Sequence, residues 1–99
     1  MKVNYLGASL RVGISARDNS PYQIGEILFS IPDKNGEKKD PDGKTRWNYK
    51  GYGHTTRTIG LDPGKIELFK DCEAGTEVDL IVEPVPSNPS RNQVIGFKA

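Results

Sequence analysis

Ninety-nine residues, 34% of them hydrophobic and 27% charged, are enough for one domain (1–99) with a small core. The single cysteine, Cys72, excludes an internal disulfide, and no apolar run is long enough for a membrane span or a signal peptide. The formal net charge is +1. Because the chain has only one cysteine, we expect a cytoplasmic protein.

Residues 2–14 predict a first strand, and YQIGEILFSI at 22–31 predicts a second. In the second segment Ile27 and Phe29 fall on one face, as the alternation of a half-buried strand requires. Between them, GISARDNSPY at 13–22 is rich in turn-forming residues. The two strands are therefore expected to be joined by a protruding hairpin.

The segment DKNGEKKDPDGK at 33–44 is predicted to be a solvated loop or hairpin tip. Eight of its twelve residues are charged, and its NG and DG pairs favour turns. RWNYKGYGHTTR at 46–57 follows as an extended third strand, although it contains no aliphatic side chain. LDPG at 61–64 predicts a turn or a single 3₁₀ turn.

The alternation in TEVDLIVE at 76–83 predicts a fourth strand with Val78 and Leu80 directed inward. A polar connection at 85–92 leads to a last strand at 92–98. Prolines and glycines interrupt the chain so often that helix signals are almost absent. Five short strands predict an all-β fold, either a small barrel or a sandwich.

Charge is distributed unevenly along the chain. Residues 34–57 hold seven lysines and arginines against three acidic residues, whereas residues 60–83 hold two against seven. If the fold separates these segments, one face is positive and could meet an anion.

The stretch 46–57 gathers rings and cations, and two interpretations stay open. The rings could be the core of a strand. Alternatively, exposed rings stack on the bases of a single strand while nearby cations follow its phosphates. KGYG at 50–53 also resembles the KGFGF-like element of cold-shock and RNA-recognition proteins.

The hairpin at 13–22 carries Arg17 between its arms, with Arg11 on the first arm and Tyr22 opening the second. These residues could belong to an ordinary surface loop or to a binding loop.

LRVGISARDNSPYQIGEILFSIPDK resembles the single-stranded DNA-binding proteins of filamentous phages, the gene V-type helix-destabilising proteins. The pattern consists of Gly13, Ser15, Arg17, Pro21, Tyr22 and Glu26 in that order. The C-terminal EAGTEVDLIVEPVPSNPSRNQVIGFKA looks like the last hairpin of that family. The middle, 33–58, is longer than in that family.

The resemblance implies a five-stranded OB-like antiparallel barrel with protruding hairpins, acting as a homodimer that coats viral single strands during genome replication and before packaging. It makes the first hairpin a DNA-binding wing, with Arg11 and Arg17 on phosphates and Tyr22 as a stacking ring. The candidate DNA-binding residues are Arg11, Arg17, Tyr22, Arg46, Trp47, Tyr49, Lys50, Tyr52, Arg57 and Arg91. The expected partner is single-stranded DNA, or RNA, inside the host cytoplasm.

No enzyme is expected, and neither a cofactor, a metal, a membrane nor a small-molecule substrate is implied. His54 has no ligand set around it, and Cys72 lies beside two carboxylates that disfavour a thiolate. The alternative function is a protein-interaction or structural assembly module, with Trp47, Tyr49 and Tyr52 as anchors and the separated charges driving head-to-tail association. A cold-shock-like RNA-binding domain is a further alternative.

Overall fold

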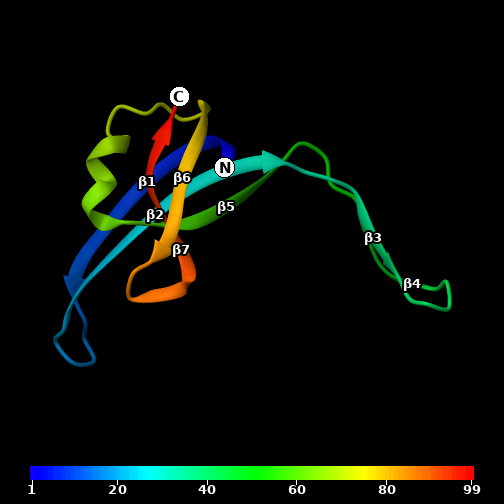
Figure 1. Cartoon of the computed structure of the whole chain (residues 1–99), viewed down its shortest axis with the longest axis horizontal. Helices are drawn as coiled ribbons and strands as arrows, with labels where there is room; N and C mark the ends of the chain where they lie inside the picture. The colour runs from blue at the N-terminus through cyan, green and yellow to red at the C-terminus, as the bar shows by residue number, and fades with distance from the viewer.

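A computed structural model describes all residues, 1–99, as seven strands and one short helix. Figure 1 shows the elements in chain order. They are β1 (Lys2–Ile14), β2 (Pro21–Pro32), β3 (Gly36–Lys39), β4 (Thr45–Tyr49), β5 (His54–Leu61), the 3₁₀ helix η1 (Pro63–Phe69), β6 (Glu77–Val85) and β7 (Asn88–Lys98).

Five strands close into a barrel in the order β1-β2-β5-β7-β6. All neighbours are antiparallel except β5 and β7, which pair in parallel through Gly60 and Leu61. The all-β, OB-like barrel expected from the sequence is confirmed.

The barrel interior is filled by side chains that alternate along the strands. Ile27, Val78 and Val94 are fully buried, and Tyr5 and Phe69 lie beside them. Phe69 comes from η1, and its ring centroid lies 5.8 Å from that of Tyr5, so the short helix covers one end of the barrel. The inward direction predicted for Ile27 and Val78 is confirmed.

The middle of the chain differs from the sequence prediction. Residues 33–44 are not only a loop, because β3 pairs with β4 in a separate two-stranded sheet. The expected continuous strand at 46–57 is wrong: β4 ends at Tyr49, and β5 begins only at His54. Gly53 turns the chain between them with φ = +81°, a conformation that favours glycine.

Two further boundaries were wrong. LDPG does not end as a single turn, because Asp62 caps a seven-residue 3₁₀ helix by accepting a hydrogen bond from the Gly64 N–H. The polar connection expected at 85–92 is much shorter, since β6 continues to Val85 and β7 starts at Asn88. A polar segment can still pair as a strand when its side chains remain exposed to solvent.

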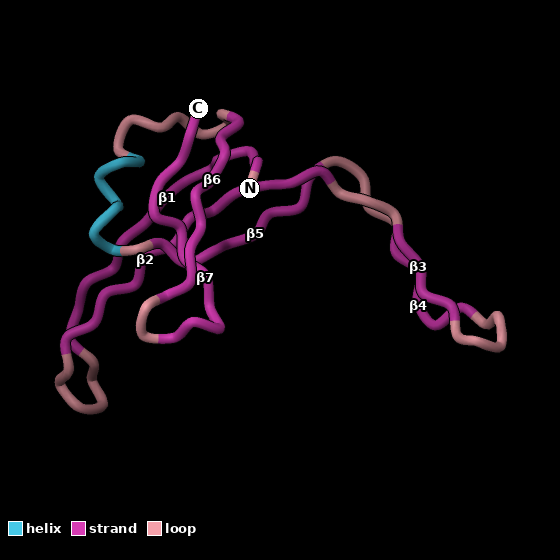
Figure 2. Tube along the Cα trace, viewed as in Figure 1, coloured by secondary structure: helices cyan, strands magenta, loops and turns pink.

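Two hairpins project from the barrel in different directions (Figures 1 and 2). The wing, residues 10–25, is the free end of the β1–β2 hairpin and was predicted as a protruding hairpin. The arm, residues 33–53, contains β3 and β4 and extends from the opposite side of the barrel. Together they stretch the molecule to 53 × 36 × 23 Å. The structure has no helix whose length and apolar content would allow it to cross a membrane.

Replacing Ile27 by alanine tests the interior of the barrel. We expect the free energy of unfolding to fall by about 2–5 kcal/mol, because buried methyl groups are lost and a cavity remains. Urea unfolding measures the change. Ile24→Ala, at an exposed position of the same strand, should alter it by no more than about 0.5 kcal/mol. Equal losses in the two variants would contradict the assigned faces of β2.

Candidate nucleic-acid interface

The wing places two of the predicted residues on one face. Arg11 pairs across the hairpin with Ile24, and Gly13 pairs with Tyr22. Opposed residues of an antiparallel pair share a face, so Arg11, Ile24 and Tyr22 project on the same side of the wing. The Tyr22 ring lies across Gly13, where an added Cβ would stand only 2.7 Å from the tyrosine oxygen. The absence of a side chain at Gly13 therefore leaves room for the ring at this position.

The tip of the wing holds Arg17 in a hydrogen-bonded turn. The Arg17 N–H donates to Ser15 Oγ at 3.2 Å, and the Ser20 N–H donates to Asp18 Oδ1 at 3.0 Å. The bond from Ser20 lowers the pKa of the Asp18 carboxyl below its ordinary value. Asn19 takes a positive φ of 58°, which asparagine tolerates better than most residues. The Arg17 guanidinium is exposed and has no ion-pair partner.

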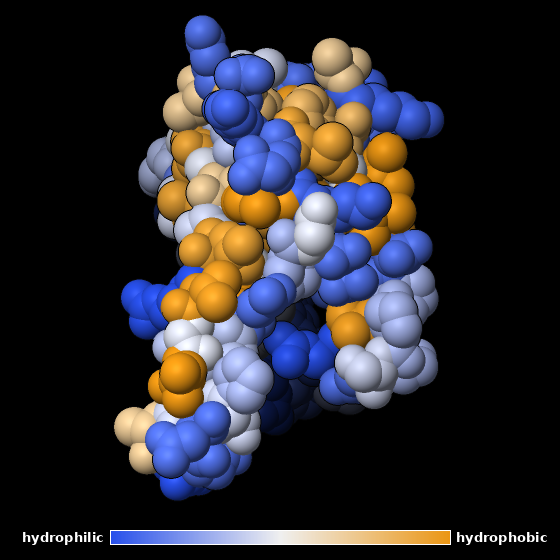
Figure 3. All heavy atoms as spheres, turned by 90° about the vertical axis from the view of Figure 1, so that its left-hand side faces the viewer, coloured by the Kyte–Doolittle hydropathy of each residue, from blue (hydrophilic) through white to orange (hydrophobic).

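A groove of about 440 Å³ separates the base of the wing from the β6–β7 hairpin. Figure 3 shows this side of the molecule, with a hollow beside the projecting wing and apolar residues along the wing. Arg91, predicted from the sequence as a binding residue, lines the groove. Four side-chain amides also line it, none of which was predicted: Gln23, Asn88, Asn92 and Gln93.

The outer face of β2 continues from the wing toward the arm. Ile24 and Leu28 are exposed on it, and Thr58 of β5 lies opposite Leu28. Glu26 lies between the two aliphatic residues and lines shallow hollows on either side. Its carboxylate would repel a phosphate, yet it can accept hydrogen bonds from the amino groups of bases. This face therefore suits bases better than a phosphate backbone.

The arm exposes its rings. Lys38 pairs with Trp47 and Gly36 pairs with Tyr49, so these residues share a face. Trp47 is 50% exposed and Tyr52, at the base of the arm, is 84% exposed. The interpretation of these rings as a strand core is wrong, because β3 and β4 contain no buried residue.

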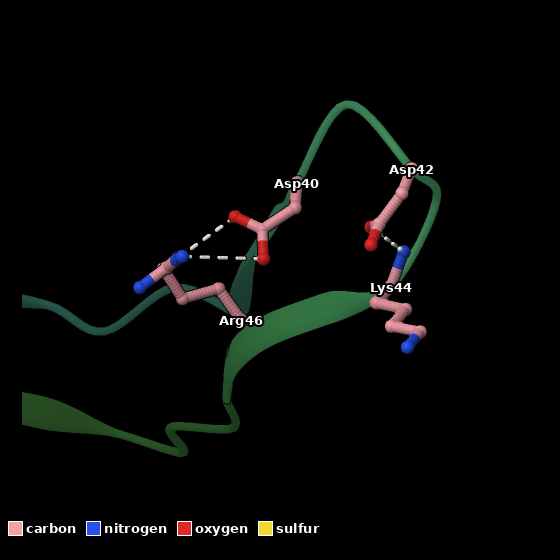
Figure 4. Close-up of polar contacts among 4 residues, drawn as sticks. All are labelled: Asp40, Asp42, Lys44 and Arg46. Atoms are coloured by element: carbon pink, nitrogen blue, oxygen red, sulfur yellow. Dashed lines mark hydrogen bonds and ion pairs between the residues drawn. The ribbon is translucent and has the colours of Figure 1, made fainter.

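Arg46 already has a carboxylate partner at the end of the arm. Its Nε donates to Asp40 Oδ1 at 2.8 Å and its Nη2 donates to Asp40 Oδ2 at 3.3 Å (Figure 4). In the same turn the Lys44 N–H donates to Asp42 Oδ1 at 3.0 Å. Arg46 therefore has an acidic partner, whereas Lys44 has none.

Asp33 fastens the base of the arm to the barrel, a role that the sequence did not indicate. Its Oδ2 accepts hydrogen bonds from the Tyr49 hydroxyl at 2.8 Å and from Thr55 Oγ1 at 2.6 Å. The bonds from Thr55 and Tyr49 lower the pKa of Asp33, while the bond to Asp33 raises the pKa of Tyr49. The carboxylate therefore stabilises this arrangement above the ordinary pKa of aspartate, and the contribution is lost as the pH falls through the lowered value.

The ten predicted residues do not form one surface. Arg11, Arg17, Tyr22 and Arg91 lie at the wing and groove, whereas the residues from 46 to 52 lie on the arm, on the opposite side of the barrel. Arg57 alternates with Thr56 and Thr58 along β5 and lies near Asp33 instead. The candidate residues therefore fall into separate groups, because the wing and the arm project from opposite sides of the barrel.

Two other reactive side chains have ordinary structural surroundings. His54 Nδ1 lies 3.2 Å from the Ser30 hydroxyl, within hydrogen-bond distance. Burial raises the pKa of the Cys72 thiol, which disfavours the nucleophilic thiolate.

Asp33→Asn tests the fastening of the arm. Removing the charge should lower the pKa of Tyr49 toward its ordinary value, because the ionised acceptor no longer favours the protonated phenol. Ultraviolet absorbance of tyrosinate during a pH titration measures this shift. Asp42→Asn, at the far end of the arm, is the control and should leave the titration unchanged. Identical curves for Asp33→Asn and the unaltered protein would contradict the assignment.

A family model described as CTX phage RstB protein matches residues 2–95, which include the wing, the groove and the arm. No curated protein and no solved structure matches the chain.

Proposed function

The chain belongs to the CTX phage RstB protein family, a filamentous-phage family, and from this premise we propose that it is a sequence-tolerant single-stranded DNA-binding protein. In this proposal it works as a gene V-type helix-destabilising protein in the host cytoplasm. It coats the viral strand during phage genome replication and holds it before packaging. The role needs no catalytic step and no cofactor.

One observation carries the proposal: the free cations and the ring of the wing lie beside a polar groove at the position where OB barrels bind oligonucleotides. That position is the face of the second and third barrel strands between the loop joining strands one and two and the loop joining strands four and five. Here the corresponding elements are β2, β5, the wing and the β6–β7 hairpin. A groove of about 440 Å³ occupies this position.

Each group in this region matches one part of an unpaired strand, either a phosphate or the face of a base. Arg11, Arg17 and Arg91 neutralise phosphates and release condensed counterions. Tyr22 offers a ring on which a base can stack whatever its identity. Ile24 and Leu28 give apolar contact to further base faces. A duplex hides its base faces, so the same surface should prefer single strands.

The base of the arm extends this path. Lys50 and Tyr52 are exposed between the end of β4 and the start of β5. We assign them to the same strand, which would pass from the wing along β2 toward the arm.

The homodimer expected from the resemblance is part of the proposal. Apolar side chains that a second copy could cover are present on the wing, where Val12 and Ile14 are 65% and 69% exposed. They lie on the face opposite to Arg11 and Tyr22, so a dimer contact there would leave these two residues free to bind DNA. Gln23, which pairs with Val12 and lines the groove, shares the face that the contact would cover.

Replacing Arg17 by alanine tests the phosphate contacts. We expect weaker binding to oligo-dT and a slope of log K against log salt concentration that is smaller by about 0.7, the value for one phosphate contact on a single strand. Fluorescence anisotropy of a labelled oligonucleotide measures both. Lys65→Ala, an exposed cation on η1, is the matched control and should keep the original slope. An unchanged slope in Arg17→Ala would remove this residue from the interface.

Replacing Tyr22 tests the stacking contact. Tyr22→Ala should weaken binding by about 1–3 kcal/mol, because one base loses its aromatic partner, whereas Tyr22→Phe should bind nearly as the unaltered protein does. The same titration with an oligoribonucleotide and with duplex DNA defines the preferred partner. Equal affinity for duplex and single strand, or no binding to either, would overturn the proposed function.

A further inference from the structure

The arm has more apolar surface than a solvent-exposed hairpin needs. None of the residues in β3 and β4 is buried, and an isolated two-stranded hairpin is at best marginally stable in water. Yet Trp47 stands half-exposed on it, with its ring over Gly36, where an added Cβ would lie 3.4 Å from the ring. Tryptophan at such a position is the residue type most enriched among the anchors of protein interfaces.

The arm also carries unpaired positive charges, one of them next to Trp47. Four of its lysines have no ion-pair partner: Lys34, Lys38, Lys44 and Lys50. Lys38 lies directly opposite Trp47 and on the same face. The arm therefore presents a ring with a free cation beside it.

A hollow of about 350 Å³ lies near the C-terminal end of β7, between η1, the segment that follows it and β6. Its apolar lining includes Leu68, which is 55% exposed, together with Val78 and Phe97. Asp71 and Glu73 also line it, and neither has an ion-pair partner. The hollow is thus apolar inside and acidic at its rim.

We propose that the arm of one copy docks on the next copy, with Trp47 in this hollow and Lys38 against Asp71 and Glu73. The ring matches the apolar lining, and the cation matches the unpaired carboxylates. The occupant is a second copy rather than a nucleic acid, because the acidic rim repels phosphates, and Arg46 on the arm is held by Asp40.

The contact joins different surfaces of the two copies, so it is heterologous. The arm leaves the barrel on the side away from η1 (Figure 1), and the arm of a copy therefore points away from its own hollow. A head-to-tail contact of this kind repeats from copy to copy, and it produces an open row of copies unless the rotation between neighbours closes a ring. The inference does not depend on the proposed function, although a row of copies would suit a protein that coats a strand.

The experiment separates the two halves of the contact. Trp47→Ala disables the arm and keeps the hollow, whereas the double variant Asp71→Lys with Glu73→Lys disables the hollow and keeps the arm. Sedimentation velocity without nucleic acid, at low salt and over a range of concentrations, measures association. The unaltered protein should form species larger than the proposed homodimer as its concentration rises, and added salt should reverse this, because exposed charges are screened.

Each variant alone should associate about tenfold or more weakly, the effect of losing an interface anchor. An equal mixture of the two should regain the pairwise contact, since one supplies the arm and the other the hollow. Tyr52→Ala and Tyr22→Ala should both associate as the unaltered protein does. Because no nucleic acid is present, a failure of the proposed function leaves these results unaffected. Concentration-independent sedimentation of the unaltered protein, unimpaired variants or an inert mixture would overturn the inference.

Discussion

Along β2 every second side chain enters the barrel. This alternation determines which side chains of β2 face outward and which strands β2 can pair with. Ile27 and Phe29 are buried, so Ile24, Glu26 and Leu28 must face outward. The same strand pairs with β1 to build the wing and with β5 to close the barrel. A slip of one residue would bury the outer row and expose the core, which makes the register costly to change. The candidate binding face is therefore fixed by the packing of residues on its other side.

The features that the sequence predicted are those that depend on local pattern. Burial of Ile27 and Val78 follows from alternation within one segment, and the wing follows from the cluster of turn residues between two such segments. The break between β4 and β5 left no such trace, because a segment without buried side chains carries no periodic signal. The polar groove was missed for another reason: Gln23 and Asn92 are unremarkable alone and become neighbours only when β2, β5 and β7 assemble. The bond from Tyr49 to Asp33 likewise joins residues 16 positions apart across a projecting hairpin.

Rings and cations that cluster in the sequence belong mainly to the arm, and the wing is a separate region of the structure. The basic segment 34–57 is mainly the arm, whereas the wing, with its few cations, belongs to a segment of balanced charge. The acidic segment is η1 and the start of β6, on the other side of the barrel from the arm. The net charge of a segment therefore does not indicate the position of the candidate face. Among the arginines of the two hairpins, Arg11 and Arg17 have no acidic partner, whereas Arg46 is paired with Asp40.

The two proposals share only the arm, where Lys50 and Tyr52 are assigned to the strand and Lys38 and Trp47 to the docking contact, so different residues make the two contacts. A strand lying along the wing and the groove would leave Trp47 and the hollow near Leu68 uncovered. One ring and one cation make a small interface, so the contact between free copies should be weak and transient. Copies bound side by side on one strand would meet at a far higher effective concentration, and a weak contact then suffices to favour adjacent binding. A stronger contact would assemble copies without a strand, so weakness of the docking is what would make the assembly depend on its nucleic acid.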